Sequence, residues 1–157
     1  RRGETFVTKK IIRALIKIKM GKQKILYLGN LDAKRDWGHA RDYVIAMWKI
    51  LQLKQPDDFV IATGKQYSIR QFIGFVSKKL NMKIIWKGKG LKEKGYDTIS
   101  KRNIISIDKN YIRPLDVNTL LGNASKARKK LSWKPKINIH QLIDEMISEE
   151  VKILDNE

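Results

Sequence analysis

The sequence predicts an α/β fold, and two observations carry this prediction. Short apolar runs typical of strands alternate with longer segments whose apolar residues recur at helical spacing. Glycine or proline lies between several of these segments, as expected at element boundaries. The strands are few and short, which makes a poor central sheet for a complete doubly wound domain. We therefore expect the distal part of such a fold.

The first half of the chain contains two predicted helices and two predicted strands. The helices cover residues 6–20, which end at Gly21, and residues 40–53. The strands cover residues 25–28 and 59–62. The apolar positions that predict the helices are Ile11, Ile12, Leu15 and Ile18 in the first, and Val44, Met47, Trp48 and Leu51 in the second.

The middle of the chain contains a third helix and two strands around a loop. Ser68 is placed to cap this helix, whose apolar residues continue to Leu80. Strands are expected at 83–87 and 104–107, and residues 88–103, rich in Gly and Lys, are expected to form a mobile loop.

Two further helices close the chain. Asn123 is placed to cap a short helix through Leu131, and the last helix covers about 139–154. Three aromatic residues lie on apolar faces and are expected in the core: Trp48, Phe72 and Trp133.

Composition excludes several classes of protein. The 157 residues contain no Cys, which excludes disulfides, thiolate chemistry and cysteine-ligated metals. No apolar run approaches the roughly 20 residues that a membrane span needs. The net charge of +18 (34 Lys+Arg against 16 Asp+Glu) invites a nucleic-acid interpretation. Abundant Lys together with abundant Ile instead indicates compositional drift, and the last segment is acidic.

The opening residues carry no apolar segment typical of a secretory signal, and the first residue is not Met. We expect a piece of a longer, cytoplasmic protein.

Motifs for a self-sufficient catalytic centre are absent. The chain has no Tyr-x-x-x-Lys, no P-loop, no Gly-x-Ser-x-Gly and no Gly-x-Gly-x-x-Gly or Gly-x-x-Gly-x-x-Gly after a strand. Two histidines, His39 and His140, are too few for a histidine-rich metal site. His39 is expected to be a structural hydrogen-bonding residue.

Polar residues are dense between the first strand and the second helix. Arg35 lies at this junction, where α/β folds tend to bind ligands, and its guanidinium suits a diphosphate. The alternative is a solvated pair of Arg35 with Asp36. Asp36 and Asp42 are also explained as partners of the helix dipole.

A second candidate lies at residues 111–117, Tyr-Ile-Arg-Pro-Leu-Asp-Val. Arg113 and Asp116 flank a proline, and the pair suits a nucleotide, with the guanidinium on phosphate and the carboxylate on ribose. An ordinary salt bridge would show the same spacing.

At these motifs the sequence resembles the C-terminal part of the GDP-mannose 4,6-dehydratase family, within the extended short-chain dehydrogenase/reductase superfamily. The matching stretches are RRGETFVTKKI (1–11), YLGNLDAKRDWGHARDYVIAMW (27–48), DDFVIATGKQYSIRQF (58–72), YIRPLDVNTLLGNASKARKKLSWKP (111–135) and LIDEMI in the last helix.

The resemblance implies a role for the whole chain. Residues 1–157 would be the substrate-binding portion of an NAD(P)-binding, Rossmann-like fold. The N-terminal Rossmann half, which binds NADP and supplies a Thr/Ser, a Glu and a Tyr-x-x-x-Lys pair, is absent from these residues. The complete enzyme would convert GDP-mannose to GDP-4-dehydro-6-deoxy-mannose, the precursor of GDP-fucose and GDP-rhamnose. This portion would bind GDP and be inactive alone.

Residue roles follow from the matching positions. The resemblance implies a cofactor contact for Arg2 and base contacts for Val7 and Lys10. It implies diphosphate contacts for Arg35 and Arg113, and a ribose contact for Asp116, where the family commonly has Glu. Lys9 stands where the family usually has Arg.

Two other readings remain open. One is another nucleotide-sugar epimerase or dehydratase of the same superfamily, and the other is a basic nucleic-acid-binding module. The resemblance further implies GDP-mannose as ligand and a homodimer or homotetramer for the complete protein, without membrane association.

Overall fold

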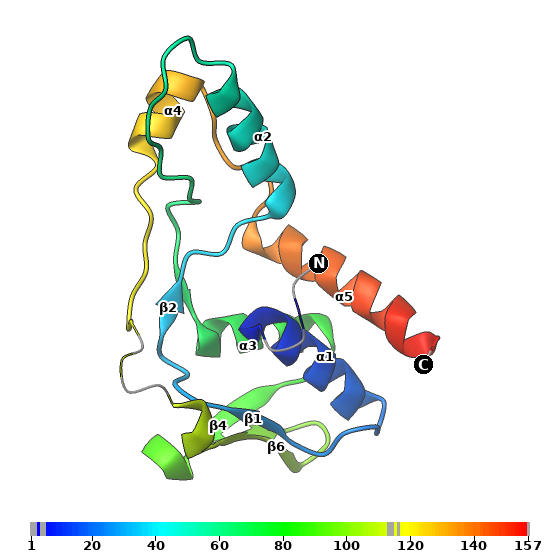
Figure 1. Cartoon of the computed structure of the whole chain (residues 1–157). Helices are drawn as coiled ribbons and strands as arrows, with labels where there is room; N and C mark the ends of the chain where they lie inside the picture. The colour runs from blue at the N-terminus through cyan, green and yellow to red at the C-terminus, as the bar shows by residue number, and fades with distance from the viewer. Residues whose placement is uncertain (1–2, 4–5, 113–114, 116, 157) are drawn as a thin grey trace.

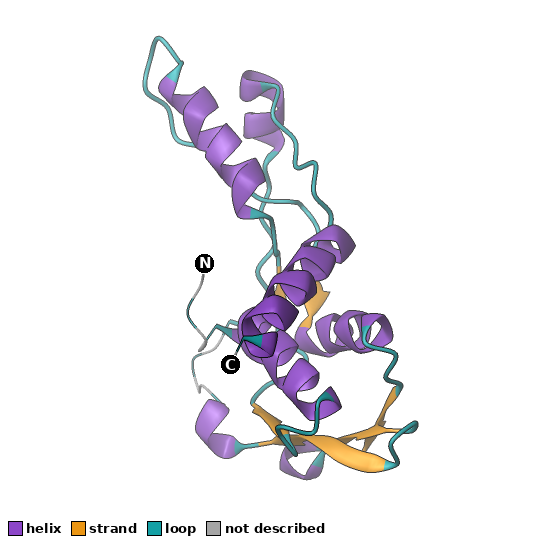
Figure 2. Ribbon diagram, turned by 90° about the vertical axis from the view of Figure 1, so that its right-hand side faces the viewer, coloured by secondary structure: helices purple, strands orange, loops and turns teal. Residues whose placement is uncertain are grey.

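The computed structural model describes residues 3, 6–112, 115 and 117–156. They form a mixed sheet with helices on one side and, beyond these, an arm that carries two further helices (Figures 1 and 2). In chain order the elements are α1 (Val7–Lys19), β1 (Leu26–Leu28), β2 (Lys34–Arg35), α2 (Ala40–Leu51), β3 (Tyr67–Ser68), α3 (Ile69–Lys79), β4 (Ile84–Lys87), η1 (Gly90–Lys92), β5 (Lys94–Asp97), β6 (Arg102–Ile107), η2 (Lys109–Tyr111), α4 (Ser125–Leu131) and α5 (Ile139–Asp155). Within this described part, no helix combines the length and apolar character needed to cross a bilayer.

The main sheet has the strand order β1-β6-β5-β4. β1 runs parallel to β6, whereas β5 pairs antiparallel with both β6 and β4. In β1, Leu26 and Leu28 are buried and Tyr27 is exposed, so this strand presents one face to the core. The predicted α/β class is confirmed, in a mixed rather than wholly parallel sheet.

The main core lies between the sheet and helices α1, α3 and α5. All four apolar residues that predicted α1 are buried here, as are Phe72 and Ile73 of α3. Gly21 ends α1 as expected, with φ +76°. Ser68 caps α3 in a capping box with Gln71. Helix α5 packs along α1, where Arg13 donates to Glu150 at 2.6 Å.

The mobile loop expected at residues 88–103 is wrong. This segment forms β5, the short helix η1 and the start of β6. Glycine suits position 95, because a Cβ there would lie 3.0 Å from the side chain of Ile105 and 3.1 Å from that of Trp86. The Gly- and Lys-rich composition therefore did not predict strand β5, in which Gly95 leaves room for the neighbouring side chains.

Asp97 fixes the turn that follows β5. Its carboxylate accepts hydrogen bonds from the backbone N–H groups of Lys83 (2.9 Å) and Ser100 (3.0 Å). Burial raises the pKa of Asp97, but these hydrogen bonds outweigh burial and hold the pKa below its ordinary value. Because the pKa is lower in the folded state, the stabilisation is present above about pH 4 and is lost as the pH falls.

We expect Asp97→Asn to lower the free energy of unfolding by about 1 kcal/mol at pH 7, since hydrogen bonds to a charged acceptor become neutral ones. At pH 3 the difference should be smaller than at pH 7, because the stabilisation from a carboxylate whose pKa is lowered by folding is lost as the pH falls below about 4. Urea unfolding at both pH values measures this. A difference that is equal at the two pH values would contradict the assigned role of the charge.

Helix α2 is confirmed, but its predicted core face is wrong. Val44, Met47, Trp48 and Leu51 are all exposed, and Trp48 is 60% exposed. The expected core positions of Phe72 and Trp133 are confirmed, at 0% and 3% exposure. The strand expected at residues 59–62 is extended chain that pairs with no described segment.

The arm consists of α2, α4 and the extended chain around them (Figure 1). Its small core is rich in alanine and contains Ala46, Ala62, Ala124, Ala127, Leu131 and Trp133. Asn123 accepts from the N–H of Ser125, the first residue of α4, although the N-cap residue itself is Ala124. Lys126 and Lys130 on α4 donate to Asp57, and these bonds hold the pKa of Asp57 well below its usual range.

Candidate functional site

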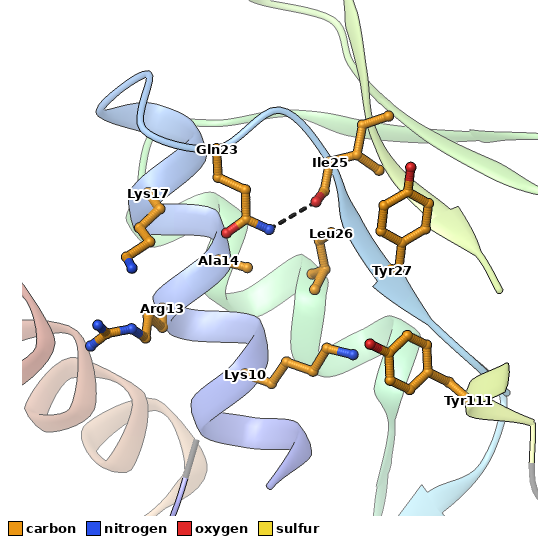
Figure 3. Close-up of a pocket in the computed structure, with 9 residues that line it drawn as sticks. All are labelled: Lys10, Arg13, Ala14, Lys17, Gln23, Ile25, Leu26, Tyr27 and Tyr111. Carbon is orange, nitrogen blue, oxygen red and sulfur yellow. Dashed lines mark hydrogen bonds between the residues drawn. The ribbon is translucent and has the colours of Figure 1, made fainter. Parts of the chain in front are cut away.

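A cavity of about 300 Å³ lies between α1 and β1 (Figure 3). Its walls combine a basic helix face with strand and aromatic residues. The lining residues are Lys10, Arg13, Ala14, Lys17, Gln23, Ile25, Leu26, Tyr27 and Tyr111.

Lys10 and Gln23 supply two of the polar groups of this cavity. The Lys10 ammonium lies 3.2 Å from the centroid of the Tyr111 ring. Gln23 donates from Nε2 to the carbonyl of Ile25 at 2.8 Å. Its Oε1 points away from this carbonyl (Figure 3). A cation, an aromatic ring and an amide oxygen in one cavity suit a flat heterocycle that has both acceptors and donors.

Backbone contacts fix Tyr111 in this position. The N–H of Asp108 donates to the carbonyl of Leu28 at 2.8 Å, and Asp108 accepts from the N–H of Asn110 at 2.9 Å. Gly29 allows the close approach of Tyr111, because a Cβ at Gly29 would overlap the Tyr111 carbonyl. The end of β1 therefore positions the aromatic wall of the cavity.

Arg35 lies on β2, which is held from both sides. β2 pairs with β3, and Lys34 exchanges backbone hydrogen bonds with Asn118 (2.8 Å) and Leu120 (3.1 Å). The Arg35 guanidinium donates to the carbonyls of Lys34 (2.8 Å) and Val117 (2.6 Å). Arg35 is thus attached to the segment that follows Asp116 in the sequence.

A second cavity, of about 530 Å³, lies between α1, α5 and residues 35–43. Arg35, Thr8 and Lys9 line it, together with Trp37 and several residues of α5. Both cavities therefore border the first turn of α1, with Lys9 on one side and Lys10 on the other. Val7 is half-buried and packs against the main core.

The carboxylates of Asp36 and Asp42 both accept hydrogen bonds from backbone N–H groups of segments that are distant in the sequence. Asp36 accepts from the N–H and hydroxyl of Thr63 and from the N–H of Gly64. Asp42 is buried and accepts from the N–H groups of Lys136 and Ile137, each at 2.9 Å. Asp36 is therefore not simply solvated, and both carboxylates have backbone partners in addition to the helix dipole expected for them.

His39 has hydrogen-bond partners on both ring nitrogens. Nδ1 accepts from the N–H of Arg41 at 3.0 Å, so the proton lies on Nε2, which faces Glu145 at 3.1 Å. This is the arrangement expected of a structural histidine. Among the described residues there is also no cluster of acidic and histidine side chains that could hold a metal.

The structure brings the predicted site residues together only in part. Lys10 and Arg35 line two cavities that share the first turn of α1. Tyr111, which contacts Lys10, and Val117, whose carbonyl accepts from Arg35, are only a few residues apart in the sequence. Arg2, Arg113 and Asp116 lie outside the described residues, so their assigned roles stay predictions.

Sequence reasoning missed Gln23 as a cavity residue. It placed Tyr111 at the start of the second candidate motif but assigned it no contact. A polar row along α1 was also available as a signal, because Lys10, Arg13 and Lys17 recur at helical spacing opposite the buried face. No sequence pattern pointed to Gln23, because only folding brings this residue to the cavity.

Comparison with known proteins identifies relatives for nearly the whole chain. A family model described as GDP-mannose 4,6 dehydratase matches residues 1–146. The GDP-mannose 4,6-dehydratase of Vibrio cholerae is 48% identical over 98% of this chain, and that of Dictyostelium discoideum is 47% identical over 99%. In both cases the chain spans only 44% of the relative, so it corresponds to a C-terminal part.

Solved structures share the fold at lower identity. RMD from Pseudomonas aeruginosa, complexed with NADPH, has a TM-score of 0.75 at 18% identity, covering 97% of this chain and 44% of that one. The dTDP-glucose 4,6-dehydratase of Bacillus anthracis, in complex with NAD, has a TM-score of 0.70 at 18% identity, covering 96% and 40%. The fold is therefore that of extended short-chain epimerases and dehydratases.

Proposed function

The chain belongs to the GDP-mannose 4,6-dehydratase family, and we propose that it forms the part of such an enzyme that binds the GDP end of GDP-mannose. The observation that carries the proposal is the cavity in which Lys10, Tyr111 and Gln23 meet, next to the α1 turn that also borders Arg35. As an isolated chain it would bind nucleotide without turnover.

In this proposal the guanine occupies the cavity between α1 and β1. The Lys10 ammonium donates to the acceptors on one edge of the base, and Gln23 Oε1 accepts from its N–H groups. Tyr111 forms one wall. A base that offers both acceptors and donors on adjacent edges, as guanine does, satisfies both side chains.

The diphosphate then passes over the first turn of α1 towards Arg35. That turn contains no acidic residue, and its N-cap residue Phe6 makes no side-chain cap. A helix N-terminus favours an anion, and two guanidinium groups, Arg35 and Arg113, would neutralise a diphosphate by forked hydrogen bonds. Asp116 would accept from a ribose hydroxyl.

The contribution of this part to catalysis is orientation. Contacts to GDP lie far from the hexose, and the binding energy of such remote groups holds the reacting ring in place. The net reaction of the complete enzyme is loss of water from GDP-mannose to give GDP-4-dehydro-6-deoxy-mannose.

The described residues lack the glycine-rich turn that binds a dinucleotide in a Rossmann fold. β1 ends at Leu28 and the chain continues into β2, not through such a turn into a helix. We propose NADP as the cofactor, bound mainly by the part of the enzyme that this chain does not span, and assign no step to it here. The complete protein would be a homodimer or homotetramer.

The experiment joins this chain to the N-terminal part of the Vibrio cholerae relative and supplies three nucleotide sugars. We expect turnover of GDP-mannose and none of UDP-glucose or dTDP-glucose. Preferential turnover of a UDP or dTDP sugar would assign the chain to another enzyme of the same superfamily.

Lys10→Met in that joined protein should weaken GDP binding about tenfold, which corresponds to about 1.4 kcal/mol and the loss of one charged hydrogen bond. Methionine keeps the length of the side chain and removes the ammonium. Lys19→Met, at the exposed far end of the same helix, is the matched control and should bind as the wild type. Calorimetric titration with GDP measures both, and equal affinity of the two variants would remove Lys10 from the site.

A further inference from the structure

Arg70, the second residue of α3, bridges two carboxylates from distant parts of the chain. Its guanidinium donates from Nε and Nη2 to Asp32 at 3.0 and 3.3 Å, and from Nη1 and Nη2 to Glu93 at 2.7 and 3.2 Å. Its Cζ lies 4.8 Å from the centroid of the Trp86 ring. The side chains of Arg70 and Glu93 are only 27% and 16% exposed. A forked and partly buried arrangement of this kind fixes geometry more firmly than a single exposed ion pair does.

The bridge connects two segments that flank opposite edges of the main sheet. Asp32 belongs to the segment between β1 and β2 (Figure 1), whereas Glu93 lies between η1 and β5, in the connection that follows β4. A guanidinium has five N–H donors, and the two carboxylates engage most of them. Arg70 is therefore suited to hold these segments together rather than to bind a phosphate itself.

The start of α3 holds the same segment through its backbone. The first N–H groups of a helix have no partner within the helix. In α3 these groups, from Ile69 and Arg70, donate to the carbonyls of Ala33 at 3.1 Å and Leu31 at 2.9 Å. Leu31 and Ala33 are both buried. Arg70 thus contacts residues 31–33 through its backbone and its side chain together.

Residues 31–33 lead directly into β2, which carries Arg35. In β2, Lys34 and Arg35 pair with Ser68 and Tyr67, the two residues that precede α3. The segment before β2 and the start of α3 therefore form one connected unit. The position of the Arg35 guanidinium depends on how firmly this unit is held.

We propose that Arg70 is a positioning residue for the diphosphate of GDP-mannose, which holds the segment before β2 against α3 and Glu93 and so aligns Arg35 with the phosphates. The inference rests on the proposed function, since it requires Arg35 to bind the diphosphate. The cavity between α1 and β1 is lined by other residues. Loss of Arg70 should therefore weaken the contacts to phosphate and leave the contacts to the base intact.

The test uses this chain joined to the N-terminal part of the Vibrio cholerae relative. Calorimetric titration measures the dissociation constant of GDP, and competition with GDP measures that of guanosine, which has no phosphate. We expect Arg70→Gln to raise the constant for GDP about tenfold, the order for one misaligned charged hydrogen bond, and that for guanosine by less than about twofold. An unchanged constant for GDP would overturn the proposal. An equal rise for both ligands would also overturn it, because that result indicates a general change of the fold.

A matched control lies at the other end of the same helix. Lys79 on α3 donates to Asp144 at 2.8 Å, and both side chains are about half exposed. Lys79→Met removes this ion pair and should leave both dissociation constants unchanged. A rise for GDP equal to that of Arg70→Gln would show that any lost ion pair on α3 has the same effect, which contradicts a specific role of Arg70.

Asp32→Ala breaks the bridge from its more exposed side. The Asp32 side chain is 74% exposed, so the fold should tolerate this change even where it does not tolerate Arg70→Gln. We expect Asp32→Ala alone to raise the dissociation constant of GDP several-fold. Combined with Arg70→Gln it should raise this constant no further than Arg70→Gln does, because both changes remove the same contact. An unchanged constant in Asp32→Ala, or additive losses in the double variant, would overturn the proposal.

Failure of the proposed function gives a different result. A wild-type joined protein that does not bind GDP has no guanine nucleotide site, and the proposed function and this inference are then both wrong. A wild-type protein that binds GDP, together with an Arg70→Gln variant that binds it equally well, overturns this inference alone.

Discussion

Phe72→Ala is expected to lower the free energy of unfolding by about 3–5 kcal/mol, the range for removing a buried aromatic ring. Phe72 is 0% exposed at the centre of the main core. Its ring centroid lies 4.9 Å from that of Trp37, with the planes tilted by 54°. The substitution therefore removes both buried apolar area and the contact that supports Trp37.

The effect should extend to the candidate site. Trp37 follows Arg35 and Asp36 in the chain and lines the larger cavity. Urea unfolding measures the stability, and GDP titration under native conditions measures the site. Phe72→Leu keeps most of the volume and should cost roughly 1 kcal/mol. A loss from Phe72→Ala below that of Phe72→Leu would contradict the assigned core.

Asp42→Ala is expected to cost about 2–4 kcal/mol, because two N–H groups lose a charged acceptor at once. Asp42 is 3% exposed, and its carboxylate accepts from the N–H groups of Lys136 and Ile137. The backbone carbonyl of the same residue accepts from Trp133 at 2.9 Å. Asp42 therefore attaches α2 to the segment that leads from α4 into α5.

Asp42→Asn is the matched variant for this prediction. Its side-chain oxygen can still accept from both N–H groups, so it should recover about half of the loss or more. Thermal unfolding followed by circular dichroism compares the two. Equal losses for alanine and asparagine would show that these hydrogen bonds do not stabilise the junction.

Elements with long apolar periodicity were predictable from the sequence. The helices over 7–19 and 139–155 follow from their buried faces, and Ser68 correctly marked the start of α3. The strands at 26–28 and 84–87 were predictable from short β-branched and aromatic runs.

Elements whose stability depends on distant partners were not predictable in this way. β2 and β3 have two residues each and exist because Lys34 and Arg35 pair with Ser68 and Tyr67. β5 contains Gly and Lys, and it forms a strand because it pairs with β4 and β6. The core prediction for Trp48 failed for the opposite reason, because periodicity identifies an apolar face and not what covers it.

The site could be predicted only with the family resemblance. A single Arg beside a strand does not distinguish a diphosphate site from a surface residue, and Lys10 is one of many lysines. The fold adds that Lys10, Gln23 and Tyr111 converge on one cavity, which no spacing in the sequence encodes.

Calorimetric titration of the 157-residue chain with GDP tests the central claim most directly. We expect binding of GDP that is tighter than binding of UDP, and a loss of about 1.5–3 kcal/mol in Arg113→Ala, the range for hydrogen bonds to charged groups. Lys19→Met should bind GDP as the wild type. Equal affinity for GDP and UDP, together with no effect of Arg113→Ala, would contradict a guanine nucleotide site in this chain.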